Sequence, residues 1–187
     1  MAACAGPTIR QDIPPTTWRE HTARLDAIDA WTAIGKLALR SESASETAAL
    51  VWRQAGGETR VRLSGPLGVG ATRIHSDGQV LDIRRGDERR VIDISTPRAI
   101  ERNTGWDLPL QALPYWLRGL PAPGTDVESL RFDPATGLVR QLRQRGWRVD
   151  YDDYRRCRDL SLPTRVSIEK GDTRARVVIR EWQCGAG

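Results

Sequence analysis

The stretch that decides the fold class is ATRIHSDGQVLDIRRGDERRVIDI, residues 71–94. It holds three short runs of alternating apolar and polar residues: 71–76, 79–84 and 89–94. They are separated by Asp77-Gly78 and by Gly86-Asp87. Asp-Gly between two such runs is a strong signal for a tight hairpin, because glycine accepts the positive φ that the turn needs. The stretch therefore predicts three consecutive antiparallel strands.

The same period-two pattern predicts further strands on both sides of this stretch. Before it they cover residues 33–40, 50–52 and 60–63, and after it residues 127–132, 138–144, 147–151, 164–170 and 173–182. Short connections between strands favour antiparallel pairing. A mainly β fold with about eleven antiparallel strands is expected, and so wide a sheet should curl into a barrel or barrel-like sheet with room for a ligand. A packed sandwich with helices on its edge is the alternative.

Three helices are predicted beside the strands. Thr16 or Thr17 caps the first, and four apolar residues follow at helical spacing: Trp18, Leu25, Ile28 and Trp31. Thr96-Pro97 opens the second, which runs to about Asn103. The third begins at Asp107 with a stripe formed by Leu110, Leu113, Leu117 and the neighbouring Trp116, and Pro114 shortens or kinks it. The two later helices are expected to cover or plug the mouth of the barrel.

Length and composition predict a single domain with a full-sized hydrophobic core. The chain has 187 residues, 39% hydrophobic and 28% charged, with a net charge of +5. No run reaches the roughly 18 apolar residues of a spanning helix, which excludes a polytopic membrane protein. The charge suits nucleic acid, anionic lipid or an acidic protein, although the arginines are spread along the chain as on a solvated surface. Residues 1–15 are interpreted as a tether, 16–184 as a single domain and 185–187 as a tail.

The three cysteines form no zinc pattern, since no C-x-x-C occurs. Met1-Ala2-Ala3-Cys4 is similar to the end of a bacterial lipobox, with an incidental cysteine as the alternative. If Lys170 and Thr173 flank a tight turn, Cys184 lies opposite Asp159, two residues from Cys157. A Cys157–Cys184 disulfide is therefore predicted if the chain before Pro163 bends back.

Enzyme and nucleic-acid functions find little support. G-x-S-x-G and H-E-x-x-H are absent, and the only histidines, His21 and His75, are interpreted as structural or solvated. Arg143, Arg145 and Arg148 flank a turn instead of forming a platform interleaved with aromatic residues. No catalytic residue, metal, cofactor or nucleic-acid partner is predicted.

Several short motifs, in the order and at the spacing found here, resemble the LolB family of outer-membrane lipoprotein receptors. Between Trp18 and Trp182 they are Trp18-x-x-His21, Trp31-x-x-x-Gly35, Gly65-Pro66-Leu67-Gly68, the run from Gly105 to Leu110, the run from Trp116 to Pro121, Gly146-Trp147 with Tyr151, and Leu162-Pro163.

The resemblance implies an incomplete, unclosed barrel of eleven antiparallel strands with helices as a lid over a hydrophobic cavity. It implies a monomeric receptor on the periplasmic face of the outer membrane, anchored through lipid on Cys4. Such a receptor takes lipoproteins from the soluble carrier LolA and places them in the inner leaflet without ATP. A general periplasmic carrier of lipid or other hydrophobic ligands is the alternative.

An acyl cavity should be lined by apolar residues of the early strands and the lid. The candidates are Leu37, Leu39, Leu50, Trp52, Val61, Leu63, Leu113, Trp116 and Leu117. Gly65-Pro66-Leu67-Gly68 joins two strands yet places an apolar side chain where a polar turn is expected. In the LolB family the corresponding leucine projects into lipid, so the resemblance assigns membrane insertion to Leu67. A leucine folded back on the core is the alternative.

Overall fold

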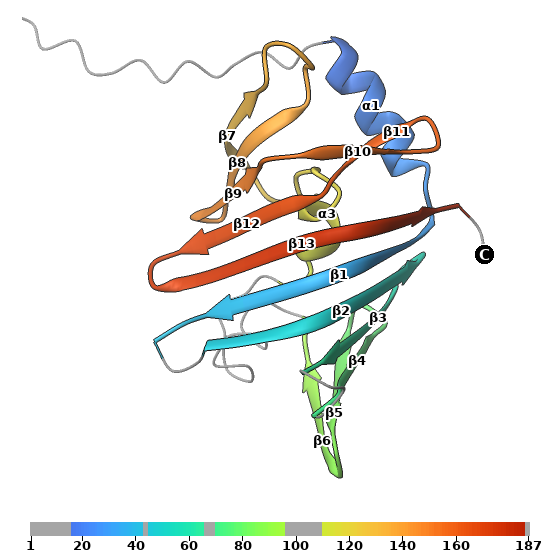
Figure 1. Cartoon of the computed structure of the whole chain (residues 1–187), viewed down its shortest axis with the longest axis vertical. Helices are drawn as coiled ribbons and strands as arrows, with labels where there is room; N and C mark the ends of the chain where they lie inside the picture. Colours follow the sequence, from blue (N-terminus) through green and yellow to red (C-terminus); the bar gives the residue numbers. More distant parts are fainter. Residues whose placement is uncertain (1–15, 43–44, 66–69, 96–109, 186–187) are drawn as a thin grey trace, which may run out of the picture.

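A computed structural model of the chain describes residues 16–42, 45–65, 70–95 and 110–185. Its main sheet contains eleven strands (Figure 1). In chain order they are β1 (Ala30–Arg40), β2 (Ser45–Ala55), β3 (Glu58–Ser64), β4 (Thr72–Ser76), β5 (Val80–Arg85), β6 (Glu88–Asp93), β7 (Val127–Phe132), β8 (Val139–Gln144), β9 (Trp147–Tyr151), β12 (Arg165–Lys170) and β13 (Thr173–Cys184). Each of the eleven predicted strands corresponds to one of these, so the mainly β fold is confirmed.

The sheet is antiparallel and is not closed. Its hydrogen-bonded order is β6-β5-β4-β3-β2-β1-β13-β12-β9-β8-β7, which places the first and last strands of the chain side by side in the middle. The edge strands β6 and β7 are not paired with each other. They are also separated in sequence by residues 94–126, a connection too long for a hairpin. The unclosed sheet agrees with the expectation drawn from the family.

The first helix, α1 (Thr16–Asp26), is shorter than its apolar spacing predicted. Trp18 and Leu25 are buried on one face as expected, but Trp31 lies on β1. The helix packs over β11 (Leu160–Pro163) and β7 at one end of the sheet (Figure 1), with the Trp18 and Phe132 rings 5.5 Å apart. It closes that end of the core, so the expectation from the resemblance that the helices form a lid is wrong for this helix.

The helix predicted from Asp107 to Gly119 is reduced to one turn, α3 (Leu113–Trp116). Pro114 has no N–H to donate and sits in the first turn, where that loss is tolerated. Gly119, at φ 81°, takes the left-handed conformation that ends the segment. The predicted helix at 96–103 and the start of the third at Asp107 lie outside the described residues.

A small hairpin was not predicted. It consists of β10 (Tyr154–Cys157) and β11 (Leu160–Pro163), which pair only with each other among the described strands. The hairpin interrupts the path from β9 to β12 and lies beside α1 in Figure 1. Because of it, β12 begins at Arg165, and the pairing of β12 with β13 stops at Arg165–Val178.

Candidate functional site

An apolar cavity of about 740 Å³ lies between the main sheet and the segment that contains α3. Side chains from β1–β5, β12 and β13 form the sheet side, and residues 110–115, 117–118 and 122–125 form the other. Along β2 and β3 the residues at every second position, such as Leu50 and Trp52, face the cavity. This alternation follows from the pleat of the strand. The volume lies within the range of roughly 300–1,000 Å³ of small-ligand sites.

The structure brings eight of the nine predicted cavity residues together around this space. They are Leu37, Leu39, Leu50, Trp52, Val61, Leu63, Leu113 and Leu117. Further apolar lining comes from Ile28, Trp31, Ile74, Leu81, Ile168 and Val177, which were not proposed as lining from the sequence. Trp31 and Trp52 are stacked with their ring centroids 6.2 Å apart and form one wall.

Trp116 is not part of the lining, although its neighbour Leu117 is. Its side chain is fully buried behind the cavity, with its ring 6.3 Å from that of Trp147. The indole N–H donates to Oε1 of Gln144 at 2.9 Å, and the Trp116 carbonyl accepts from the Tyr151 hydroxyl at 2.9 Å. Adjacent residues on a helix point about 100° apart, so only one of the two can face the cavity. Trp116 instead fixes α3 to β8 and β9.

Gln144 has a structural role that the sequence reading missed. It is completely buried, and its Oε1 also accepts from the Ala122 N–H at 2.9 Å. Its Nε2 donates to the carbonyls of Ala122 and Thr125, at 2.8 and 3.0 Å. One amide therefore holds the chain on both sides of Gly119 against the sheet. The sequence gives one signal for this role, which is a glutamine at an inward-facing position of a strand. A buried amide needs hydrogen-bond partners to offset the cost of its desolvation.

Arg118 is a second buried polar residue whose structural role was not predicted from the sequence. Its side chain is buried and crosses from α3 to the end of α1, where Nη1 donates to the Leu25 carbonyl at 2.9 Å. Its Nε donates to the Pro114 carbonyl at 3.2 Å. Burial lowers the pKa of the guanidinium, while Asp26 and Tyr115 act in the opposite direction. Arg118 is thus a second donor to the Leu25 carbonyl at the helix end, which also accepts from the Ile28 N–H at 3.2 Å.

The two histidines occupy different surroundings. His21 on α1 is buried, and its Nε2 has no hydrogen-bond partner among the described residues. Desolvation lowers the pKa of His21, opposed by a backbone hydrogen bond with Ser161. His75 is exposed on β4, with Nε2 2.6 Å from Oε1 of Glu58. Neither residue lines the cavity.

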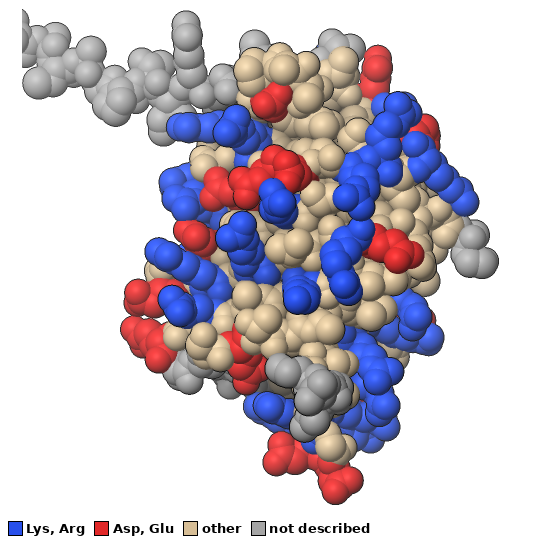
Figure 2. All heavy atoms as spheres, viewed as in Figure 1, with Lys and Arg blue, Asp and Glu red and all other residues tan. Residues whose placement is uncertain are grey.

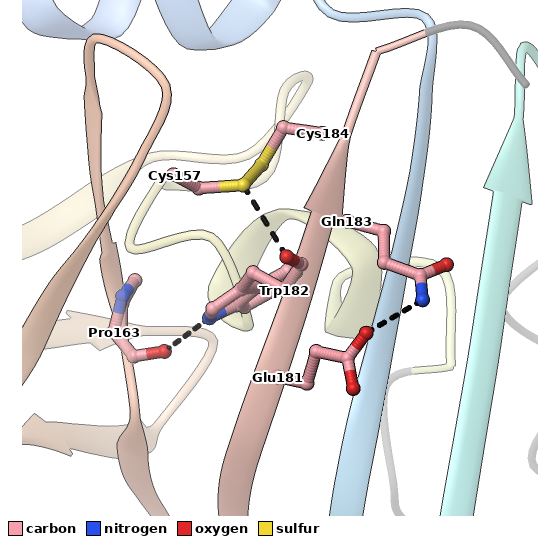
Figure 3. Close-up of a disulfide and its surroundings, with 6 residues drawn as sticks. All are labelled: Cys157, Pro163, Glu181, Trp182, Gln183 and Cys184. Carbon is pink, nitrogen blue, oxygen red and sulfur yellow. Dashed lines mark hydrogen bonds between the residues drawn. A yellow bond between two sulfur atoms is a disulfide. The ribbon is translucent and has the colours of Figure 1, made fainter.

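Cys157 and Cys184 are joined by a disulfide that ties β10 to the end of β13 (Figure 3). The predicted register of β12 and β13 is confirmed, with Lys170 opposite Thr173, but this pairing stops at Arg165–Val178 and does not extend to Cys184. The β10–β11 hairpin, which was not predicted, carries Cys157 to the end of β13. Trp182 reinforces the same junction, since its indole N–H donates to the Pro163 carbonyl at 2.8 Å. Cys4 and Pro66–Gly68 lie outside the described residues, and Gly65 directly follows β3.

An open antiparallel sheet of this kind defines a class of β folds that solved structures share. A LolA-superfamily protein from Nitrosomonas europaea superposes with a TM-score of 0.53 at 11% identity, covering 86% of this chain and 88% of that one. A DUF1329-family protein from Desulfovibrio piger gives 0.58 at 10% identity, covering 93% and 94%. At these identities the likeness concerns the fold alone.

Sequence comparison narrows the class to one family. The family model described as "Outer membrane lipoprotein LolB" matches residues 29–182. The chain is 40% identical to the outer-membrane lipoprotein LolB of Alkalilimnicola ehrlichii, over 97% of this chain and 90% of that protein. It is 37% identical to LolB of Chromohalobacter salexigens, over 98% and 85%. The chain belongs to the LolB family, which confirms the resemblance drawn from the motifs.

Proposed function

We propose that the chain is an outer-membrane lipoprotein receptor that holds the acyl chains of its cargo in the cavity. The observation that supports this most is the cavity itself, in which leucine, isoleucine, valine and tryptophan side chains are the largest group of lining residues. Moving one CH₂ group from water into such surroundings is worth roughly 0.8 kcal/mol. A cavity of this volume can therefore bind part of an acyl chain strongly without forming any specific polar contact.

The proposal assigns the steps of transfer to different parts of the chain. A LolA-type carrier delivers the lipoprotein, and the α3 segment acts as the lid that the acyl chains pass. Cys4 carries the lipid that anchors the receptor at the periplasmic face of the outer membrane. Leu67 enters the bilayer and brings the cavity close to the lipid. No ATP is needed, since each step moves acyl chains between apolar environments.

No helix among the described residues is long and apolar enough to cross a membrane. Lipid on Cys4 would attach the chain to the membrane without a spanning helix. Contact of Leu67 with the lipid would add to that anchoring, because burying a leucine is worth roughly 1.5–3 kcal/mol. The two contacts together would hold the receptor against the inner leaflet.

Reconstituted transfer tests the proposal. The full chain is mixed with a carrier loaded with a radiolabelled lipoprotein and then with liposomes, and the label is followed from carrier to receptor to lipid. We expect Leu67→Glu to accept cargo normally and to release it into liposomes at least tenfold more slowly, because a carboxylate is costly to place among acyl chains.

Gln79→Glu is the matched control, since it makes the same charge change in the exposed turn between β4 and β5. It should transfer at the rate of the unmodified chain. A chain that binds a fluorescent fatty acid but takes nothing from the loaded carrier would instead support a general carrier of hydrophobic ligands. Failure to bind the fatty acid at all would contradict both functions.

A further inference from the structure

Arginines form a continuous row across four neighbouring strands. The register places Arg62 of β3 opposite Arg73 of β4, Arg73 opposite Arg84 of β5, and Arg84 opposite Arg89 of β6. A second pair, Arg53 and Arg60, lies opposite each other on β2 and β3. We call these six residues the arginine face.

The arginine face lies on the side of the sheet away from the cavity. Its residues alternate along the strands with cavity residues such as Val61, Leu63 and Ile74. A shallow hollow of about 570 Å³ crosses this side and is lined by five of the six arginines, together with His75 and Asp82. Figure 2 shows basic side chains over much of the visible face of the molecule, including the lower part, where Figure 1 shows β3–β6.

The acidic residues nearby neutralise only part of this charge. Asp82 pairs with both Arg84 and Arg89, at 3.2 and 3.0 Å, and these two arginines lower its pKa to about 2. Glu58 is bound to Arg60 at 2.7 Å and to His75. Within the part of the chain that the structure describes, Arg53, Arg62 and Arg73 form no ion pair. Like charges directly opposite each other destabilise a sheet, so this face is more stable with anions bound.

The arginine face is also placed close to the segment assigned to membrane insertion. Leu63 and Thr72 are the last paired residues of β3 and β4 before the 65–71 connection, and Arg62 and Arg73 are the next pair. The turn between β5 and β6 lies at the same end of the sheet, since Arg85 opposite Glu88 ends that hairpin. Two of the unpaired arginines therefore lie one residue pair away from the connection that contains Leu67.

We propose that the arginine face binds the phosphate groups of anionic phospholipids and orients the molecule on the bilayer surface. A guanidinium presents a planar fork of N–H donors that matches phosphate oxygens. The arginine face is therefore suited to binding lipid phosphate groups and not a purely apolar surface. Each arginine near an anionic surface strengthens binding about fivefold. This inference rests on the proposed function only in naming the membrane as the source of the phosphates.

The test is co-sedimentation of the full chain, with Cys4 unacylated, with sucrose-loaded vesicles. One set is pure phosphatidylcholine and the other contains phosphatidylglycerol at about a third of the lipid. We expect binding to the anionic vesicles at low salt, its loss at about 0.5 M salt because of screening, and weak binding to phosphatidylcholine. Arg62→Glu/Arg73→Glu should weaken binding to anionic vesicles by at least about 25-fold.

The matched control is Arg131→Glu/Arg143→Glu, which makes the same change in net charge at exposed positions of β7 and β8, at the other edge of the sheet. It should stay within a few-fold of the unmodified chain. Equal loss in the two double variants would show a general effect of net charge and overturn the proposal. Binding of inorganic phosphate without a preference for anionic vesicles would also overturn it. If Arg62→Glu/Arg73→Glu loses binding to the carrier but binds vesicles unchanged, the arginine face binds a protein, and the proposal is wrong.

Binding of a fluorescent fatty acid separates this inference from the proposed function. Arg62→Glu/Arg73→Glu should bind the fatty acid as the unmodified chain does, because the arginines face away from the cavity. If that variant keeps its fatty-acid affinity and loses the vesicles, both proposals are supported. If fatty acid does not bind even to the unmodified chain, the proposed function fails while the vesicle result still stands.

Discussion

Gly35 on β1 is the residue whose identity the structure requires most strictly. A Cβ atom there would lie 2.0 Å from the Val178 carbonyl oxygen of β13, at the position where the pairing of the two strands shifts register. Such close backbone approach is a recurring reason for glycine inside a strand. This explains the glycine of the Trp31-x-x-x-Gly35 motif, which the sequence alone marked without giving its cause.

We predict that Gly35→Ala lowers the free energy of unfolding by about 2–3 kcal/mol, because backbone atoms must move to admit the methyl group. Urea denaturation followed by tryptophan fluorescence measures the change. Gly57→Ala is the control, since no atom lies within 4 Å of the added Cβ and the φ angle is not positive. Its effect should stay within about 0.5 kcal/mol. Equal stability of both variants would show that β13 adapts without cost.

The regular strands could be predicted from the sequence because their signals are local. The Asp77-Gly78 and Gly171-Asp172 turns and the period-two runs beside them correspond to observed hairpins. The β10–β11 hairpin could not be predicted in this way, since its strands have four residues each and its turn places Arg158, not glycine, at φ 57°. Its position depends on contacts distant in sequence, such as those with α1 and the disulfide.

The disulfide is expected to stabilise the domain through this hairpin. It closes a loop with a sequence separation of 27, for which the chain-entropy model gives about 3–4 kcal/mol. We therefore predict that reduction lowers the free energy of unfolding of the unmodified chain by that amount, as measured by urea denaturation. Cys157→Ser/Cys184→Ser should match the reduced chain and not respond to reductant. Two titratable thiols in a denatured, unreduced chain without Cys4 would contradict the prediction.

How the strands combine into one cavity was predictable only in part. The pairing of consecutive strands and the apolar positions follow from hairpins and alternation, which is why eight of the proposed lining residues lie together. The pairings of β1 with β13 and of β9 with β12 do not follow from them. Alternation of apolar and polar residues does not reveal which face of a strand points inward. It also does not predict that α3 has only one turn or that the Trp116 side chain points away from the cavity. These outcomes depend on packing among β8, β9 and α3, through buried groups such as Gln144 and Tyr151.

The cavity as a binding site leads to the last prediction, which uses two neighbouring alanines of β2. Ala48 lines the cavity opposite Leu37 of β1, whereas Ala49 is exposed on the other face of the strand. Ala48→Trp should place an indole in the space proposed for acyl chains, and Ala49→Trp should place the same group in solvent. We expect Ala48→Trp to weaken binding of a fluorescent fatty acid at least tenfold, since displacing two or three CH₂ groups costs about 2 kcal/mol. Ala49→Trp should bind like the unmodified chain, and both variants should keep a similar melting temperature because neither alanine is fully buried. Unchanged affinity in a folded Ala48→Trp variant would show that the acyl chains occupy another part of the molecule.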